Sequence, residues 1–291
     1  IWIYREVFVD GVKMEYATLG FYATEILLWT AALLFIVWYW RRFKSLQIKN
    51  YKLKITKDRI FVLACLSLIS YLLISITWSI DKSLALQQSL RIMEAFLLFF
   101  MLMLGPLKFN EAVKRLALGA VLPSLLGIWQ FFSQSSFAFK WLGLVGHVAS
   151  TPGTSVVVGD EIGRWLRAYG PFSHPNVFGG YAVLLFASLQ VYKFTSSSRH
   201  NRFINYSLLF TIYLLLITAI FLSFSRSALL ALAIVILLNC FIVFLRHRSL
   251  SPIIYHLSFI ILITTILSII LFPALKVRIL TTSTHEVASV V

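Results

Sequence analysis

The chain has 291 residues, of which 59% are hydrophobic and 13% are charged, and its formal net charge is +15. This composition is too apolar for a soluble domain of that length and predicts a protein embedded in membrane lipid. The Lys and Arg residues gather in short segments between apolar runs, as the orientation of membrane proteins requires, so we expect no nucleic-acid partner.

Apolar segments of about twenty residues recur along the chain, and a helix of that length crosses the hydrocarbon core of a bilayer. Eight such spans are expected, at residues 21–40, 59–78, 89–105, 113–132, 175–193, 203–222, 227–245 and 253–272. The sequence therefore predicts an all-α fold, a polytopic membrane helix bundle in which residues 1–291 form a single integral membrane domain. Pro123 is expected to kink the fourth span.

A strongly basic segment, residues 41–59, fixes the expected orientation in the membrane. It carries eight Lys or Arg residues, and the positive-inside rule places such a segment in the cytoplasm. Alternation along eight spans then puts the long loop 133–174, the junction around Arg226 and the stretch after residue 273 on the outer side.

The segment 164–181, "RWLRAYGPFSHPNVFGGY", concentrates polar residues on the outer side. Ser173 is a suitable N-cap and Pro175 suits a first helical turn, so a helix is expected to begin here. The start of a helix presents unpaired N–H groups and a partial positive charge, which favour an anion. Arg164 and Arg167 lie just upstream, and a guanidinium group matches phosphate oxygens, so a diphosphate is the expected ligand.

Other polar and small residues of this segment have two interpretations each. His174 either binds a phosphate or acts as a base, or it only satisfies the start of the helix. Asn176 either orients a sugar or phosphate oxygen, or it caps the local turn. Gly179 and Gly180 either let a lipid chain come close, or they pack one helix against another.

Further titratable residues lie in the loop before this segment and near the end of the chain. Asp160 and Glu161 are the only carboxylates of the outer loop, and each is either a general base or a solvated loop charge. His147 and His285 have no motif around them and are predicted to be surface residues.

The sequence predicts neither a metal site nor a cofactor. Cys65 and Cys240 fall inside apolar spans, where a free cysteine behaves as a small hydrophobic residue. Glu25 and Glu94 are expected to pair with cations such as Arg91. No paired Cys and His, no acidic cluster and no Gly-rich loop follows the spacing of a metal or nucleotide site.

Arg226 interrupts a nearly continuous apolar run, "FLSFSRSALLALA". A charged side chain at membrane depth is costly, and the helix dipole disfavours a cation in the first turn. These two penalties indicate an anionic partner, and the alternative is that the side chain extends to the lipid headgroups. Arg226 and the segment 164–181 are expected on the same side of the membrane, so we predict that they converge on one ligand.

Four stretches of the chain resemble the O-antigen ligase and O-antigen polymerase family of polytopic bacterial membrane proteins. They are "YATEILLW", "ITWSIDKSLALQQSL", "RAYGPFSHPNVFGGYAVLL" and "FLSFSRSALLALA". The last two are the most specific, with the pattern Arg-x-x-Gly-x-x-x-x-Pro-Asn in one and Ser-Arg-Ser in the other. Because members of this family have about twelve spans, the resemblance implies that the chain is a fragment of a longer protein.

The resemblance implies a glycosyltransferase that needs no metal or nucleotide and works at the outer face of the bacterial cytoplasmic (inner) membrane. It would move a glycan from undecaprenyl diphosphate to the lipid A-core of lipopolysaccharide, to a growing polysaccharide or to a protein. Arg226 and Arg167 are expected to be catalytic, because fixed positive groups stabilise the departing diphosphate. The residues expected to bind the diphosphate or the glycan are Arg164, His174, Asn176, Ser225 and Arg278. The general base is expected in the outer loop that follows the eighth span, in a part beyond residue 291.

Two other functions remain open. A transporter or flippase of lipid-linked glycans would also need arginines on the outer side, but the central thirds of the expected spans carry almost no charge. A non-enzymatic anchor or sensor would bind a ligand at the same residues, but it would need an output module, and the sequence shows none. We therefore expect an enzyme.

Overall fold

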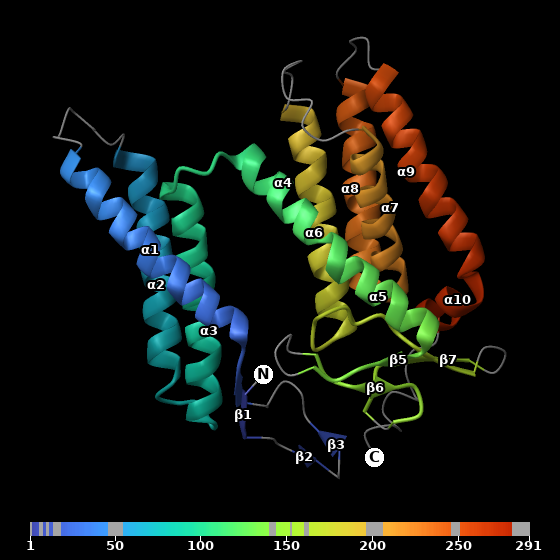
Figure 1. Ribbon diagram of the computed structural model, residues 1–291, viewed down its shortest axis with the longest axis horizontal. Helices are drawn as coiled ribbons and strands as arrows, with labels where there is room; N and C mark the ends of the chain where they lie inside the picture. Colours follow the sequence, from blue (N-terminus) through green and yellow to red (C-terminus); the bar gives the residue numbers. More distant parts are fainter. Residues whose placement is uncertain are drawn as a thin grey trace. The chain divides into compact units, whose positions relative to one another are not determined.

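A computed structural model of the protein describes residues 2–5, 8–9, 12–13, 19–45, 55–139, 144–151, 153–159, 163–195, 206–245 and 251–280. The chain forms two compact units, Ile1–Leu107 and Lys108–Val291 (Figure 1). Both units are mainly helical.

The first unit combines long helices with short strands. Its helices are α1 (Ala23–Ser45), α2 (Ile55–Ser75) and α3 (Lys82–Leu104). Its strands are β1 (Trp2–Arg5), β2 (Phe8–Val9), β3 (Val12–Lys13) and β4 (Leu19–Phe21). β1 pairs antiparallel with β4, and β2 pairs antiparallel with β3.

Charged side chains join α1, α3 and the strands of this unit. The carboxylate of Asp81 accepts the N–H of Leu84 at 3.0 Å and so caps α3, and it also pairs with Arg5. Arg91 lies 4.0 Å from Glu25, as predicted. Glu94 instead accepts a hydrogen bond from the indole of Trp29 at 2.8 Å.

The second unit holds most of the residues that the sequence singled out. Its helices are α4 (Phe109–Gly119), α5 (Val121–Ser133), α6 (Pro175–Thr195), α7 (Tyr206–Leu222), α8 (Arg226–Leu245), α9 (Ser251–Ile270) and α10 (Phe272–Leu280). Its strands are β5 (Ser135–Ser136), β6 (His147–Val148), β7 (Val156–Gly159) and β8 (Gly163–Leu166). β5 pairs with β6, and β7 pairs with β8, both antiparallel.

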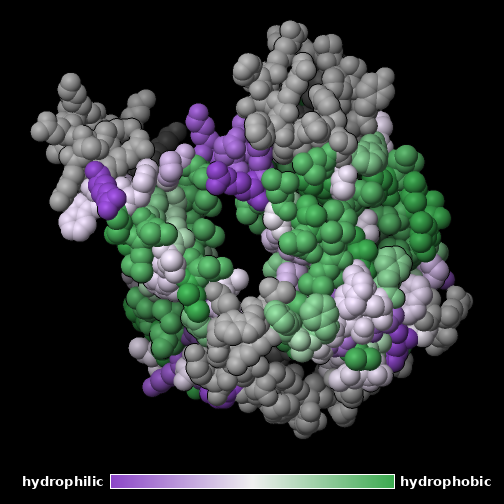
Figure 2. Space-filling model, in the orientation of Figure 1, coloured by the Kyte–Doolittle hydropathy of each residue, from purple (hydrophilic) through white to green (hydrophobic). Residues whose placement is uncertain are grey.

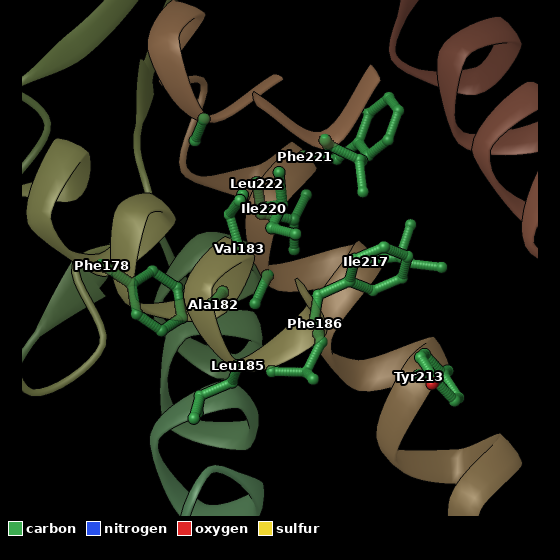
Figure 3. Close-up of a cluster of buried hydrophobic side chains, with 14 of the residues drawn as sticks. Phe178, Ala182, Val183, Leu185, Phe186, Tyr213, Ile217, Ile220, Phe221 and Leu222 are labelled. Carbon is green, nitrogen blue, oxygen red and sulfur yellow. The ribbon is translucent and has the colours of Figure 1, made fainter. Parts of the chain in front are cut away.

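The core of the second unit centres on the contact between α6 and α7. Figure 3 shows Phe178, Ala182 and Phe186 of α6 in one apolar cluster with Tyr213 and Ile217 of α7. The rings of Phe186 and Tyr213 meet edge to face, with their centroids 5.5 Å apart. This packing fixes α6, and with it the loop that leads into its first turn.

Two glycines let α5 and the loop before α6 lie against the ring of Phe178. A Cβ atom on Gly127 would lie 2.5 Å from that ring, and one on Gly170 would lie 2.6 Å from it. Gly170 also has a φ of +58°, which L side chains rarely adopt. The side chain of Gln130 in α5 binds the backbone here at two points. It donates to the carbonyl of Gly170 at 2.9 Å and accepts from the N–H of Tyr169 at 3.1 Å.

The prediction of eight membrane spans is wrong. Within the described residues, two helical segments are long and apolar enough to cross a membrane, Lys82–Leu104 and Phe109–Ser133. A third is added if Leu257–Ile270 and Phe272–Ile279, which meet at an angle of 81°, are counted as one span. Three shorter apolar helices, Leu63–Ser75, Leu208–Leu222 and Arg226–Ile242, have between 10 and 17 residues in the described part of the chain.

The number of spans is overestimated because the length of an apolar run in the sequence does not reveal where a straight helix ends. The predicted eighth span, for example, reaches the bend of 81° between Leu257–Ile270 and Phe272–Ile279. The predicted fourth span lies within Phe109–Ser133, which is long and apolar enough to cross a membrane, but it is divided into α4 and α5 at Ala120. This break comes three residues before Pro123, so the proline lies in the first turn of α5, where its missing N–H is tolerated. The prediction of a kink near Pro123 is thus close to the observed break.

The surface of the helices still fits a membrane protein. Figure 2 shows hydrophobic residues over the visible faces of the helices in each unit. Large apolar side chains such as Leu27, Leu122 and Ile269 are more than two-thirds exposed. Apolar faces of this kind, together with two helices able to cross a bilayer, are consistent with association with a membrane.

Candidate functional site

The turn that joins α7 to α8 is the centre of the candidate site. Ser223 donates its hydroxyl hydrogen to the carbonyl of Ile220 at 2.7 Å and so closes α7. Phe224 follows in the left-handed region, with a φ of +46°. Ser225 then caps α8, because its hydroxyl oxygen accepts the N–H of Ala228 at 3.4 Å. Ser223, Phe224 and Ser225 are called the α7–α8 turn below.

Arg167 is buried against this turn and is only 2% exposed. Its Nε donates to the carbonyl of Ser223 at 2.8 Å, and its Nη2 donates to Oδ1 of Asn176 at 2.6 Å. The backbone beside it is bound as well, since the N–H of Ala168 donates to the carbonyl of Leu222 at 2.9 Å. A buried guanidinium group needs such partners, and here they tie the first turn of α6 to the α7–α8 turn.

Arg278 approaches the same turn from α10. Its Nε donates to the carbonyl of Phe224 at 3.4 Å. Arg167 and Arg278 therefore bind the carbonyls of consecutive residues, Ser223 and Phe224, although they are far apart in the sequence. Both side chains thus lie at the α7–α8 turn, and the convergence of Arg226 and the segment 164–181 on one ligand stays a prediction.

Arg226 is the first residue of α8 and is exposed. Within the described part of the chain its guanidinium group takes part in no hydrogen bond or ion pair. Beside it, the hydroxyl oxygens of Ser225 and Ser227 lie 3.1 Å apart. Two hydroxyl groups, the first N–H groups of α8 and an exposed guanidinium group thus lie at one helix start, which suits an anion.

The first turn of α6 lies beside these residues and is capped by His174. Pro175 is the first residue of α6, as predicted, but the N-cap is His174 and not Ser173. Nδ1 of His174 accepts the N–H of Asn176 at 3.1 Å, and the carbonyl of His174 accepts the N–H groups of Val177 and Phe178. Of the two interpretations of His174, the structure supports its role at the start of the helix.

His174 also reaches the loop before β7. Its Nε2 lies 3.1 Å from the hydroxyl oxygen of Ser155. The backbone of Ser155 is held on both sides, because its N–H donates to the hydroxyl of Tyr169 at 2.7 Å and its carbonyl accepts the N–H of Arg167 at 3.3 Å. Ser155 therefore belongs to the site, although no feature of the sequence singled it out.

Arg164 is not joined to the α7–α8 turn by any bond among the described residues. It lies exposed on β8, and its Nε donates to the carbonyl of Ala149 at 3.0 Å. It therefore holds the loop before β7 instead of the turn. Asp160 and Glu161, the candidate bases, lie outside the described residues.

The two adjacent glycines of α6 differ in what they contact. A Cβ atom on Gly179 would lie 2.5 Å from the hydroxyl oxygen of Ser223, 3.0 Å from Cβ of Ala228 and 3.1 Å from Cβ of Ser225. At Gly180 an added Cβ would meet nothing within 4 Å. Gly179 therefore packs α6 against the α7–α8 turn, which is the packing interpretation of that residue.

His147 is buried, so the prediction that it is a surface residue is wrong. It is 9% exposed, and its ring stacks on Tyr169 with the centroids 4.1 Å apart. Burial lowers the pKa of His147 to about 4, so the ring is neutral at physiological pH. This burial could not be predicted from the residues around His147, because the stacking partner, Tyr169, lies on a different segment. His285 lies outside the described residues.

Within the described residues, no group of three or more His, Cys, Asp or Glu side chains is placed to hold a metal ion. Cys65 and Cys240 are free cysteines, as predicted. Comparison of the chain with protein-family models, with curated proteins and with solved structures gave no match.

Proposed function

We propose that this protein is a membrane glycosyltransferase of the O-antigen ligase and polymerase type, which moves a glycan from undecaprenyl diphosphate to an acceptor. One observation carries the proposal. Arg167 and Arg278 bind consecutive carbonyls of the turn from which Arg226 begins α8 with an exposed guanidinium group. This arrangement concentrates positive charge at a helix start, where the negative charge of a departing diphosphate is stabilised.

In the proposed reaction, a hydroxyl oxygen of the acceptor attacks the anomeric carbon of the glycan. The bond between that carbon and the diphosphate oxygen breaks, and its electron pair stays on the diphosphate. Arg226 is the catalytic residue, because it can contact the leaving group while this charge develops. Arg167 and Arg278 are positioning residues, because the Nε–H group of each binds a backbone carbonyl of the α7–α8 turn.

Asn176, Ser225 and His174 have supporting roles in this proposal. Asn176 accepts from Arg167, Ser225 caps the helix that carries Arg226, and His174 caps α6. The hydroxyl proton of the acceptor has to pass to a base. Asp160 and Glu161 are the candidates that the sequence offers for that step.

The proposal places the protein in the cytoplasmic membrane of a bacterium, with the α7–α8 turn toward the outer face. Alternation along eight spans no longer supports this orientation, because the described helices do not form eight spans. The support that remains is the basic segment 41–59, which favours the cytoplasm, and the family resemblance.

The test is reconstitution of the full chain in lipid nanodiscs with a glycan linked to undecaprenyl diphosphate. Released undecaprenyl diphosphate is measured in the presence of an acceptor, which is lipid A-core in one series and a second lipid-linked glycan in another. We expect release without added nucleotide and in the presence of a metal chelator. A donor that binds and is never cleaved with any acceptor would overturn the transferase and favour a transporter of such lipids.

A further inference from the structure

Ser155 is held by hydrogen bonds at both its backbone and its side chain. Its N–H group, its carbonyl and its hydroxyl are bound to Tyr169, Arg167 and His174. The strand that follows it, β7, packs against α10, the helix that carries Arg278. Ser155 is therefore bound to His174 through its hydroxyl group and to Arg167 through its carbonyl, and Arg167 in turn binds the α7–α8 turn.

The hydrogen bonds of His174 determine which atom of its ring carries the hydrogen. A backbone N–H can only donate, so Nδ1 of His174 must be the acceptor of the bond from Asn176. A neutral imidazole then has its one hydrogen on Nε2. This hydrogen points to the hydroxyl oxygen of Ser155, 3.1 Å away.

It follows that Ser155 accepts in this pair and that its own hydroxyl hydrogen is directed elsewhere. Among the described residues, no acceptor other than His174 lies within hydrogen-bond distance of that hydroxyl group. The same assignment excludes a serine nucleophile activated by His174, because Nε2 already carries a hydrogen and cannot take another from Ser155. What remains is a hydroxyl donor whose oxygen is fixed and polarised by the imidazole.

We propose that Ser155 is a further ligand-binding residue of this site, which donates its hydroxyl hydrogen to a phosphate oxygen of the lipid diphosphate, and that His174 positions it. This inference rests on the proposed function, since it needs an anionic ligand at the α7–α8 turn. Phosphate oxygens accept hydrogen bonds and do not donate them, so a hydroxyl that already accepts from a histidine is suitably polarised to bind one.

The test is equilibrium binding of radiolabelled undecaprenyl diphosphate to the full chain in lipid nanodiscs. We expect Ser155→Ala to bind roughly tenfold to a hundredfold more weakly, because a hydrogen bond to a charged group is lost. Ser155→Thr retains the hydroxyl and should bind as the wild type does. Ser188→Ala is the matched control, since Ser188 bonds only to a carbonyl of its own helix.

Substitutions at His174 separate positioning from packing. The amide of glutamine can donate to the hydroxyl of Ser155 as Nε2 does, so His174→Gln should retain more affinity than His174→Ala. Equal losses in these two variants would overturn the role given to His174.

The outcomes separate this inference from the proposed function. If the wild type binds the lipid diphosphate and Arg226→Ala does not, but Ser155→Ala binds normally, only the role of Ser155 is overturned. An equal loss in Ser155→Thr and Ser155→Ala would also overturn it, since the hydroxyl would then not be the group required. If the wild type fails to bind the lipid diphosphate, both the inference and the proposed function are overturned.

Discussion

Arg167 and Asn176 are nine residues apart in the sequence and are joined by a hydrogen bond of 2.6 Å between Nη2 and Oδ1. Because the same guanidinium group also binds the carbonyl of Ser223, this pair connects the start of α6 to the α7–α8 turn. The position of Arg226, which follows that turn, therefore depends on a side chain of another helix. The predictions below test this dependence and the packing around it.

Removing the amide of Asn176 should weaken the fold at this junction. Asn176→Ala takes an acceptor away from a buried guanidinium group, so we expect a loss of about 1–3 kcal/mol in the free energy of unfolding. Thermal unfolding of the protein in detergent measures it. Ser173→Ala is the control, because Ser173 is exposed and does not cap α6. Unchanged stability of Asn176→Ala would show that the bond contributes little.

Arg226 should matter for the reaction and not for the fold. In the reconstituted system, we expect Arg226→Ala to release undecaprenyl diphosphate about 100 to 1,000 times more slowly, which is typical when one group that stabilises developing charge is removed. Arg226→Lys should fall between this variant and the wild type, because lysine retains the charge and loses the planar fork. Arg115→Ala removes another exposed arginine and should retain the wild-type rate. A normal rate in Arg226→Ala would contradict the proposed catalytic role.

The two neighbouring glycines of α6 offer a matched pair of substitutions. Gly179→Ala places a Cβ atom 2.5 Å from the hydroxyl oxygen of Ser223, so we expect it to destabilise the protein by about 1–3 kcal/mol through overpacking. Gly180→Ala meets nothing within 4 Å and should stabilise α6 by roughly 0.5–1 kcal/mol, because alanine favours a helix interior. Chemical denaturation of both variants gives the two free energies of unfolding and tests this prediction. Equal effects of the two substitutions would contradict the close contact at Gly179.

The burial of His147 predicts a loss of stability in acid. Its pKa falls from 6.5 to about 4 on folding, so the unfolded chain binds more protons between these values. The contribution of His147 is complete above pH 6.5 and is lost as the pH falls toward 4. From pH 7 to pH 5 we expect the free energy of unfolding to fall by roughly 2 kcal/mol.

A substitution isolates this contribution from those of other titrating groups. His147→Phe retains an aromatic ring to stack on Tyr169 and removes the titrating group. The difference between the wild type and this variant should therefore change with pH over the same interval. Parallel pH profiles for the two proteins would show that the ring of His147 is not protected from protonation.

The sequence identified the parts of the site that have a local signature. Pro175 at the start of a helix and the Ser-Arg-Ser junction around Arg226 follow general rules of capping and of charge in apolar segments. A ligand shared by Arg167, Arg278 and Arg226 stays a prediction. The binding of adjacent carbonyls by Arg167 and Arg278 could not be predicted, because hydrogen bonds between distant segments leave no pattern in the sequence of either segment.

The features that the sequence missed depend on tertiary packing. Ser155 has no motif, and only the folding of its loop against Tyr169 and His174 makes it part of the site. His147 was predicted to be a surface residue because polarity was the only guide to its exposure. The number of spans was overestimated because apolar composition does not reveal where a helix ends or bends, as between α9 and α10.

The left-handed conformation of Phe224 has a consequence for residues that touch no ligand. This conformation costs an L residue about 1–2 kcal/mol, so the segment would relax to another shape if it were released from its surroundings. Phe224 is fully buried, and the centroid of its ring lies 5.9 Å from that of Phe131 in α5. A smaller side chain at position 131 would remove part of the packing that holds Phe224 in this conformation. The orientation of Arg226, the first residue of α8, would then change. Variation in α5 can therefore alter how Arg226 is presented without altering the residues that would contact the substrate.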